Sequence, residues 1–515
     1  MSSTRVFVIG LDGATFDLLH PWIEEGRLPT LGKLMKTSSY GPLRSTIPPV
    51  TAPAWTSFMT GVNPGKHGIY DFISFKADSS EKILVNSTHI RSKRVWDLAG
   101  TQGKRSIILN VPLTYPPQKI EGIMVSGFPL PEQGEFIYPK EMGRELEEKV
   151  GPWWKEIGGE LFRNFDEDLF FREACECFET RLRVVDFLME KDWDLFVIVT
   201  METDRLQHLM WEKKEERLLP FYQRVDEGIG NFINRLEDRD FLIILSDHGF
   251  GPEKKTLYLN TWLKERGFLK SRKRWVRSDP GIEVEVPHRK ATPFLHRIRR
   301  AVGKRKEVID WEETVACFFD TGLVHGIGIN LKGREPKGAV DPRDYEKIRN
   351  RIMEEVRELK DEEGERVIQE IYKREDLYQG PFVNRAPDIV LVPDFAYTFS
   401  NRIRDFISKK RQDHRGVHRL NGIFFLRGPG VRKGKKMEGA QIIDVAPTIL
   451  HLLGLPVPRG MDGRVLTEAF ESDFLQSTPV CFDGTPLEVD LSKYEMTEKE
   501  AEDVKKMLKG LGYID

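Results

Sequence analysis

The sequence has no apolar run long enough to cross a lipid bilayer. Its longest apolar stretches have the length of a β-strand, whereas a membrane-spanning helix needs about 20 consecutive apolar residues. The first residues, Met1 to Thr4, lead directly into a strand-like run and leave no room for a signal peptide. We therefore expect a soluble protein without a transmembrane segment, located in the cytoplasm.

Cysteine is also scarce, with 4 residues in a chain of 515. Cys175 and Cys177 lie two positions apart in an expected helix and face different sides of it, which does not suit a shared zinc ion. Cys317 and Cys481 are far from both in the sequence. These spacings exclude a disulfide framework, and we expect four reduced thiols.

The chain has almost no net charge, because 79 Lys and Arg residues are balanced by 81 Asp and Glu residues. This balance does not indicate a sequence-specific nucleic-acid partner. Residues 264–306 depart from it, since basic side chains greatly outnumber acidic ones there and no periodicity is sustained. We expect an exposed flap, either a solvated loop or a basic surface that makes peripheral contact with anionic substrates or membrane phosphates.

Three continuous apolar runs indicate strands that are buried on both faces. They cover residues 5–11, 195–200 and 241–246. Such runs are typical of a mostly parallel sheet between two layers of helices, which makes this an α/β protein with three layers. Each run ends at polar residues, and in parallel sheets ligands bind beyond the carboxyl ends of the strands.

The polar residues at these strand ends are of metal-binding types: Asp12, Asp204, His208, Asp247 and His248. Three carboxylates gathered at one edge would repel each other unless divalent cations neutralised them. Asp204 and His208 are four residues apart and would share one face of a helix. The glycine after Asp247-His248 permits a turn that lets both side chains converge. A metal site is therefore the first hypothesis.

We expect one discontinuous core with an insertion. The core is assigned to residues 1–265 and 386–470, where the apolar run from Ala386 to Val392 resumes it. Residues 266–385 are assigned to the basic flap and to a small inserted α+β cap with a helix from Pro342 to Leu359. Residues 471–515 are assigned to a C-terminal tail that contains a charged amphipathic helix.

Thr51 is the candidate nucleophile. Pro53 suits the first turn of a helix and Gly61 suits its end, so Thr51 lies at or beside the helix N-cap. Free backbone N–H groups at such a terminus attract phosphate. Thr51 as a mere capping residue would be the preferred reading without the nearby carboxylates; with them, a hydroxyl activated by a bound cation becomes the better one.

Taken together, the motifs resemble those of the alkaline phosphatase superfamily and, within it, of the type I phosphodiesterase/nucleotide pyrophosphatase family. The resemblance covers about residues 5–265 and 386–455. It rests on seven ordered motifs: Gly10-Leu11-Asp12-Gly13, Thr51-Ala52-Pro53, Thr60-Gly61, His67-Gly68-Ile69, Asp204 to His208, Ser246-Asp247-His248-Gly249 and Gly416-Val417-His418-Arg419.

The resemblance implies an alkaline-phosphatase-like fold with two divalent metal ions, zinc first and manganese second. One ion would be held by Asp12, Asp247, His248 and the Thr51 oxygen. The other would be held by Asp204, His208 and a late histidine, which we assign to His418, with His414 as the competitor. The resemblance implies for His67 a structural role rather than a metal ligand.

The chain departs from the family pattern at two places. Where family members carry an Asn after the Pro of the nucleophile turn and another Asn after His-Gly-Ile, this chain has Ala54 and Asp71-Phe72. The amide that holds a phosphate oxygen is therefore missing. Sulfatase chemistry is disfavoured, because the turn has Thr51 rather than a Cys or Ser and has no nearby Arg.

These observations together predict a two-metal hydrolase that cleaves phosphodiester or nucleotide pyrophosphate bonds of small molecules through a phosphothreonine intermediate. The same scaffold also supports phosphomonoester or phosphonate hydrolysis and phosphosugar mutases. A non-catalytic module that binds anionic lipids or glycans through residues 264–306 is the alternative from a different class.

Overall fold

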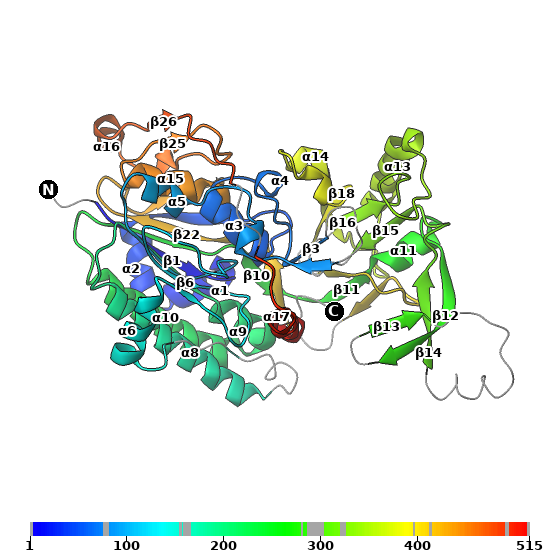
Figure 1. Cartoon of the computed structure of the whole chain (residues 1–515), viewed down its shortest axis with the longest axis horizontal. Helices are drawn as coiled ribbons and strands as arrows, with labels where there is room; N and C mark the ends of the chain where they lie inside the picture. Colours follow the sequence, from blue (N-terminus) through cyan, green and yellow to red (C-terminus); the bar gives the residue numbers. More distant parts are fainter. Residues whose placement is uncertain are drawn as a thin grey trace.

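The computed structural model describes residues 4–75, 82–153, 157, 166–279, 282–285, 303–319, 326–394, 397–410, 415–489 and 494–511. They form a large body and a smaller body beside it (Figure 1). His414, the competing late histidine, lies outside the described residues. No helix in the described ranges is long and apolar enough to cross a membrane.

The large body is organised around one mostly parallel sheet. Its strand order is β23-β2-β22-β9-β1-β8-β5-β6-β7, with β23 (Lys435–Lys436) and β7 (Ile137–Tyr138) at the two ends. The centre consists of the three predicted strands, β1 (Val6–Leu11), β8 (Leu195–Thr200) and β9 (Phe241–Leu245), which pair in parallel. The parallel part continues through β5 (Ser106–Val111) and β6 (Gly122–Ser126). On the other side β22 (Asn421–Arg427) is antiparallel to both β9 and β2 (Ser39–Arg44).

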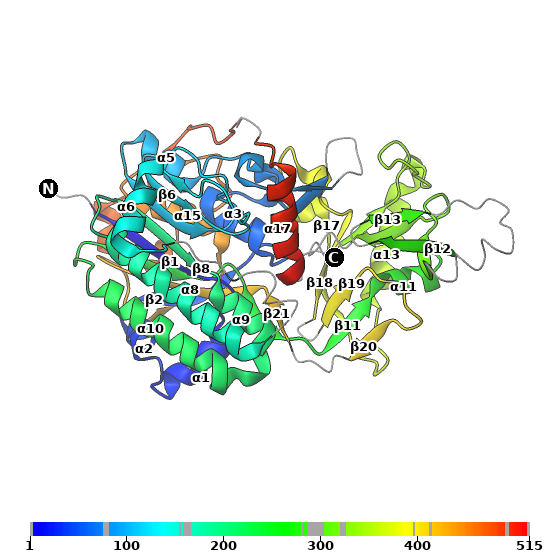
Figure 2. The ribbon, with the colours of Figure 1, turned by 60° about the horizontal axis from the view of Figure 1, so that its bottom comes forward.

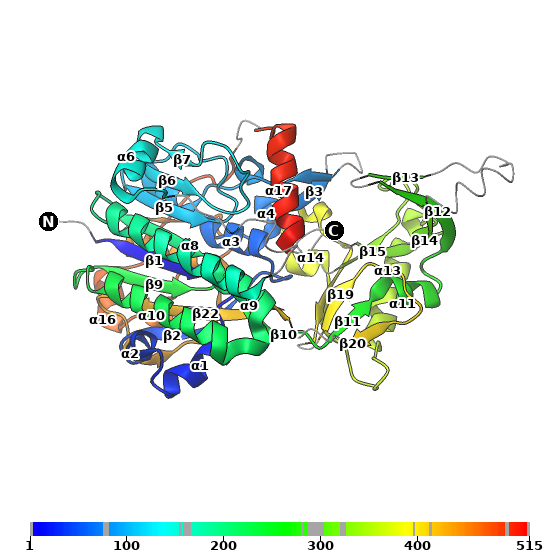
Figure 3. The same ribbon diagram turned by 90° about the horizontal axis from the view of Figure 1, so that it is seen from below.

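Helices cover both faces of this sheet, which confirms the three-layer prediction. Val6 and Val8 point to the core under α3 (Thr51–Thr60), α5 (Val95–Thr101) and α15 (Val445–Leu452). Phe7 and Ile9, the alternate residues of the same strand, belong to the opposite core. That face is covered by α1 (Phe16–Glu24), α2 (Pro29–Thr37), α8 (Glu167–Leu188), α9 (Glu202–Met210) and α10 (Leu219–Ile233), and α8 to α10 lie over the strands in Figure 3.

The smaller body has its own apolar core and its own sheets. One sheet has the order β15-β16-β18-β17 and another has the order β19-β11-β20. Their strands are β15 (Ala316–Phe319), β16 (Gly326–Ile329), β18 (Ile389–Pro393), β17 (Ile368–Lys373), β19 (Tyr397–Ser400), β11 (Lys255–Tyr258) and β20 (Ser408–Lys410). The expected helix of the cap is α13 (Tyr345–Arg357), preceded by one 3₁₀ turn.

The strand pairing corrects the predicted limits of this insertion. The run expected to resume the core at residue 386 contains β18, which pairs with β16 and β17 in the small sheet. Likewise β11 and α11 (Leu259–Glu265), expected at the end of the first core segment, pack in the small body. An apolar strand has the same local pattern in either sheet, so the sequence could not distinguish them. The chain returns to the large body with β21 (Gly416–Arg419) and β22.

The described part of the basic segment is ordered as strands rather than as an irregular flap. β12 (Ser271–Asp279) pairs with β13 (Ile282–Glu285) and β14 (Gly303–Ile309). Some of its cations pair locally: Lys264 with Glu307, and Arg272 with Asp310 at 3.3 Å. The remainder of the predicted basic surface, residues 280–281 and 286–302, lies outside the described residues.

The C-terminal amphipathic helix is α17 (Glu498–Leu511), close to its predicted limits. Its Val504 and Leu508 side chains are buried in the core of the large body. Tyr115 donates a hydrogen bond to Glu500 on its first turn. Figure 2 shows α17 on the side of the large body that faces the smaller one. All four cysteines are free thiols, as expected.

Candidate metal centre and nucleophile

The carboxyl edge of the central strands brings the predicted site residues together. Asp12 follows β1, and the Asp247-His248 pair follows β9, whose end is aligned with that of β1. Asp204 and His208 lie on α9, which begins two residues after β8. His418 arrives from β21, a short strand that pairs with β10 (Gly249–Pro252) directly after His248.

One group of potential ligands consists of Asp12, Asp247 and His248. The Nε2 atom of His248 lies 3.4 Å from Asp12 Oδ1 and 3.3 Å from Asp247 Oδ2. All three side chains are completely buried. Thr51 Oγ1 lies 3.4 Å from the same His248 nitrogen. These are the four residues predicted to share the first ion.

A second group surrounds Asp204. Its Oδ1 atom lies 3.1 Å from His418 Nε2 and 3.4 Å from His208 Nε2. The two histidine Nε2 atoms are 2.9 Å apart. His248 also lies close to this group, because its ring stacks on that of His418 with centroids 3.6 Å apart. The two groups are therefore contiguous.

Backbone carbonyls orient the three imidazole rings. His208 Nδ1 lies 3.0 Å from Gly416 O, His418 Nδ1 lies 3.0 Å from Pro49 O, and His248 Nδ1 lies 3.1 Å from Gly249 O. A carbonyl oxygen accepts a hydrogen bond and cannot donate one, so this geometry assigns the proton to Nδ1. Each Nε2 then presents a bare lone pair to the centre, which is the arrangement found in histidines that bind metal ions.

The carboxylates are short of positive partners within the described residues. Asp12 Oδ2 accepts a hydrogen bond from Trp55 Nε1 at 2.8 Å, but Asp12 Oδ1 and Asp247 Oδ2 are buried without a hydrogen-bond donor. Burial, and then the charges of Asp247 and Asp204, raise the pKa of Asp12 well above its ordinary value. Burial raises the pKa of Asp247 to about 7.

The protonation state of the imidazoles also suits metal binding. Burial lowers the pKa of His208 to about 4 and lowers that of His248 well below its ordinary value. Both are therefore neutral near pH 7, as metal ligands must be. Bare nitrogens facing each other and orphaned carboxylate oxygens are mutually repulsive unless a cation lies among them. The residues present thus fit divalent ions, and oxygen with imidazole donors suits zinc or manganese.

Thr51 is the first residue of α3, and Val50 is the N-cap. The Thr51 hydroxyl faces His248 Nε2. Thr51 therefore does not occupy the N-cap position, and its hydroxyl is directed to the first ligand group. The backbone N–H groups of Thr51 and Ala52 belong to the first turn, which has no intrahelical acceptors for them. A phosphate oxygen beside Thr51 would find these donors and the positive end of the helix dipole.

His67 lies outside both ligand groups. Its Nε2 atom is 3.0 Å from Ser57 Oγ on α3, and its Nδ1 accepts a hydrogen bond from the Ile69 amide at 3.1 Å. Burial lowers its pKa to about 3, so the ring is neutral. The expected structural role under the helix agrees with these contacts.

Some groups that hold the candidate ligands in place could not be predicted from the sequence. Trp55 reaches Asp12 across a strand that can be approached only because residue 10 is glycine: a Cβ there would lie 2.3 Å from the Trp55 ring. The carbonyls of Pro49 and Gly416 orient His418 and His208. Backbone acceptors have no residue type, so only the fold reveals them.

This mostly parallel sheet, which carries two contiguous ligand groups at its carboxyl edge, has an alkaline-phosphatase-like fold. The chain belongs to the type I phosphodiesterase/nucleotide pyrophosphatase family, whose model matches residues 6–419. A curated relative, human ectonucleotide pyrophosphatase/phosphodiesterase family member 1, is 26% identical over 278 residues. That match covers 50% of this chain but only 25% of the human protein.

Solved structures support the fold. An inactive Thr-to-Ala variant of murine ectonucleotide pyrophosphatase/phosphodiesterase 5, in complex with AMP, superposes with a TM-score of 0.51 at 14% identity, over 91% of this chain and 100% of the murine chain. A mutant of the alkaline phosphatase PafA gives a TM-score of 0.55 at 13% identity, over 92% of this chain and 99% of its own. At such identities the likeness concerns the fold alone.

Proposed function

We propose that this chain hydrolyses phosphodiester or nucleotide pyrophosphate bonds with Thr51 as the nucleophile. The carrying observation is the Thr51 hydroxyl, which lies at a helix N-terminus and 3.4 Å from His248, within the predicted ligand set. Membership of the phosphodiesterase family and the inactivity of the murine Thr-to-Ala variant point the same way.

Two divalent cations would be held by the two ligand groups, Asp12, Asp247 and His248 with Thr51 in one and Asp204, His208 and His418 in the other. Such ions supply positive charge that lowers the pKa of a bound hydroxyl or water and stabilises oxyanions. Zinc is our first choice and manganese the second.

The chain's own groups then account for binding and orientation. The first-turn amides of α3 face the phosphate oxygens, and the Thr51 oxygen attacks phosphorus as its hydroxyl proton is lost to solvent. The bond to the leaving oxygen breaks, and phosphorus remains attached to Thr51. Water next attacks the same phosphorus, which releases the product and restores the threonine hydroxyl. Trp55 and the three backbone carbonyls hold Asp12 and the imidazoles in place throughout.

A diester is the proposed substrate class because no arginine stands next to Thr51 on α3. A monoester carries one more negative charge than a diester and normally needs further cationic groups. The buried residues at the two departures from the family pattern, Ala54 and Asp71, supply none.

The test is a substrate screen with the zinc- and manganese-loaded protein. Bis(p-nitrophenyl) phosphate, p-nitrophenyl phosphate and a nucleotide pyrophosphate are compared at equal metal content. We expect turnover of the diester or the pyrophosphate, and mass spectrometry of acid-quenched protein should find the retained phosphoryl group on the Thr51 peptide. Absence of turnover on all three, with both metals bound, would refute the proposal.

A further inference from the structure

Residues 374–388 leave the small body and reach the large one. They connect β17 and β18, which are antiparallel neighbours, but they do not form a tight turn. Instead they contain α14 (Arg374–Leu377) and a 3₁₀ turn, η5 (Val383–Arg385), before the chain returns. We call residues 374–388 the strut.

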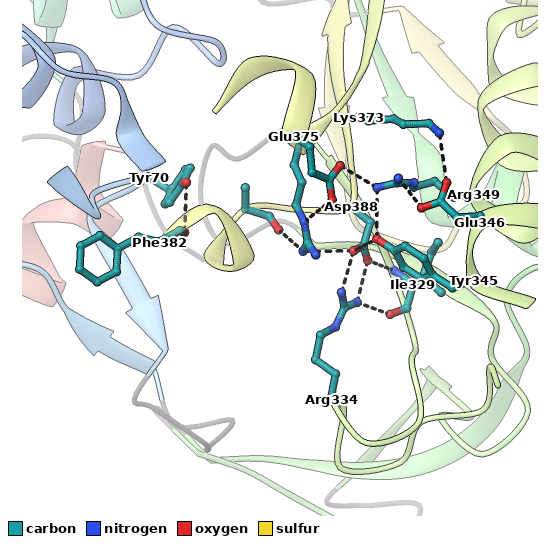
Figure 4. Close-up of polar contacts among 12 residues, drawn as sticks. Tyr70, Ile329, Arg334, Tyr345, Glu346, Arg349, Lys373, Glu375, Phe382 and Asp388 are labelled. Carbon is teal, nitrogen blue, oxygen red and sulfur yellow. Dashed lines mark hydrogen bonds and ion pairs between the residues drawn. The ribbon is translucent and has the colours of Figure 1, made fainter. Parts of the chain in front are cut away.

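The base of the strut is fixed by Asp388, whose side chain is buried (Figure 4). Its oxygens accept two hydrogen bonds from Arg334 at 2.7 Å, one from Tyr345 at 2.7 Å and one from the Ile329 amide at 2.6 Å. Arg374, at the start of the strut, lies 3.2 Å from the same carboxylate. Both ends of the strut therefore meet at one charged anchor.

Ion pairs also join α14 to the helix α13. Arg349 donates to Glu375 at 2.8 Å and to Glu346 at 2.5 Å, and Lys373 donates to Glu346 at 3.1 Å (Figure 4). Arg349 is buried, whereas its partners Glu346 and Glu375 are about half exposed, so solvent screens these pairs in part. The start of the strut is thus tied to α13 within the small body.

The tip of the strut packs its backbone directly on that of the large body. The Phe382 amide donates to Gly65 O at 2.9 Å, and the Gln379 amide donates to Asn63 Oδ1 at 3.1 Å. A Cβ on Gly65 would lie 2.6 Å from Gln379 O, and one on Gly380 would lie 2.5 Å from Gly65 O. Only glycine at both positions allows this approach.

Two buried tyrosines complete the contact. Tyr378 donates its hydroxyl hydrogen to Ile47 O, and Tyr70 donates to Phe382 O at 3.2 Å. Their rings meet edge to face with centroids 5.1 Å apart. Burial raises the pKa of both hydroxyls above the ordinary value, so both remain donors at neutral pH.

These contacts bracket the helix that carries Thr51. Ile47 lies in the turn that enters α3, whereas Asn63 and Gly65 follow its C-terminus. Between Ile47 and Thr51, the Pro49 carbonyl accepts the hydrogen bond from His418. The turn before the nucleophile is therefore held by the strut on one side and by a predicted metal ligand on the other.

We propose that the strut, through the Tyr378 hydroxyl, fixes the entry turn of α3 and so sets the position of the Thr51 oxygen relative to the ligand groups. The proposal rests on the function proposed for Thr51. Tyr378 is a positioning residue, because it acts on Thr51 through Ile47. Displacement of a reacting atom by about 1 Å can lower turnover by about a hundredfold, so loss of this one hydrogen bond should be measurable.

The test is the variant Tyr378→Phe, which removes the hydroxyl and keeps the ring. We expect kcat for the diester to fall by about ten- to a hundredfold, with KM, metal content and the shape of the pH profile unchanged. Activity is measured per folded, metal-loaded chain well below the Tm. An unchanged kcat, or loss of metal together with activity, would overturn the proposal.

The matched control is Tyr397→Phe. Tyr397 is an equally buried tyrosine of the small body whose hydroxyl donates to Asp361 at 2.9 Å, within the same body. It should keep kcat within about twofold of wild type, about 0.4 kcal/mol in the barrier, since within the described part of the chain its hydroxyl is bonded to Asp361 and not to the entry turn. An equal loss of kcat in both variants would show that any change in the packing of the small body lowers activity, and would also overturn the proposal.

Hydrogen exchange separates this inference from the proposed function. Amides of residues 45–60 should exchange faster in Tyr378→Phe than in wild type or Tyr397→Phe, whether or not the protein hydrolyses any ester. If wild type is inactive and exchange still rises, the function fails and the mechanical link stands. If wild type is active and exchange and kcat are both unchanged, the link fails and the function stands.

Discussion

Buried carboxylates at two places in the protein have opposite electrostatic surroundings. At the base of the strut, burial would raise the pKa of Asp388, but Arg334 outweighs that effect and leaves it below the ordinary value. At the carboxyl edge of the central sheet, burial and neighbouring carboxylates raise the pKa of Asp12 and Asp247. Asp388 has four donors around it, whereas Asp12 and Asp247 each keep one oxygen without a donor.

The difference separates an anchor from a binding site. A buried carboxylate with a full set of donors from its own chain is complete and holds structure together. A buried carboxylate whose remaining oxygen faces unprotonated imidazole nitrogens has no donor from its own chain for that oxygen. Such a carboxylate is suited to bind a cation. The same residue type therefore stabilises the small body and forms candidate metal sites in the large body.

The largest effect is expected for Thr51→Ala. Turnover of the diester should fall by at least about a thousandfold, because the nucleophile is lost, while both metal ions are retained by the six remaining ligands. Kinetics and elemental analysis of the same preparation measure both. Activity within about tenfold of wild type, about 1.4 kcal/mol in the barrier, would remove Thr51 from the mechanism.

His418→Ala should lose about one metal ion per chain and most activity, because a group with three protein ligands tolerates the loss of one badly. His414→Ala serves as the control and should keep both ions. Elemental analysis of the two purified variants decides between them. The reverse result would transfer the ligand role to His414.

Asp388→Asn should test the anchor. Removal of one partner of a buried ion pair costs about 3 kcal/mol or more, so the free energy of unfolding should drop by about that amount. The metal content should stay at the wild-type value, because the anchor does not contact the ligand groups. Urea unfolding measures the free energy of unfolding. A variant that lost metal before it unfolded would contradict a purely structural role for Asp388.

The pH dependence of stability should differ between the metal-free and the metal-loaded protein. In metal-free protein the raised pKa values of Asp12 and Asp247 mean that the folded state holds protons which the unfolded state releases. These two groups therefore make stability fall as pH rises from about 4 to 7, by up to about 1.4 kcal/mol per pH unit for each group. The lowered pKa values of His67, His208 and His248 act in the opposite sense over this range, because the unfolded state binds protons there that the folded state does not. Asp388 also contributes in this opposite sense, since its stabilisation is lost as pH falls below about 4.

Thermal unfolding between pH 4 and pH 8, with chelator and with zinc, measures this effect. Asp247→Asn removes one of the two raised carboxyl groups, so the stability of the chelated variant relative to chelated wild type should increase between pH 4 and pH 7. With zinc this gain should disappear, because Asp247 binds the ion in its deprotonated form. A difference between chelated variant and wild type that did not grow with pH would contradict the charge assignment.

The smallest effect concerns substrate preference. Catalytic efficiency toward an aryl diester should exceed that toward the matching monoester, and Asp71→Asn should narrow the ratio by a few-fold if its charge reaches the phosphate, about 1 kcal/mol or less. Ala54→Ser, at the other position where the chain departs from the family pattern, changes no charge and serves as the control. Faster hydrolysis of the monoester at equal metal loading would refute the diesterase assignment and leave the two-ion scheme in place.

Local patterns in the sequence predicted the central strands and the residues that end them. β1, β8 and β9 are buried on both faces, so their apolar runs are unambiguous, and the side chains that follow them had to meet at one edge. The preference for His418 over His414 came from family resemblance; pairing of β21 with β10 now places His418 beside Asp204, while His414 lies outside the described residues.

What the sequence could not predict depends on pairing between distant segments. The apolar run of β18 would suit the large sheet as well as the small one, and nothing local assigns it to β16 and β17. The Trp55 indole reaches Asp12 only because β1 and α3 lie together in the fold. The contact between Tyr378 and Ile47 joins residues 331 positions apart, and neither has a motif.

The order of the ligands along the chain has a consequence for biosynthesis. Asp12, Thr51, Asp247 and His248 are all synthesised in the first half of the chain, but His418 follows only after the whole insertion. A nascent chain thus carries one ligand group complete and the other open while the small body folds. The strut belongs to that insertion, so the nucleophile turn receives its outer support and its late histidine in the same stretch of synthesis.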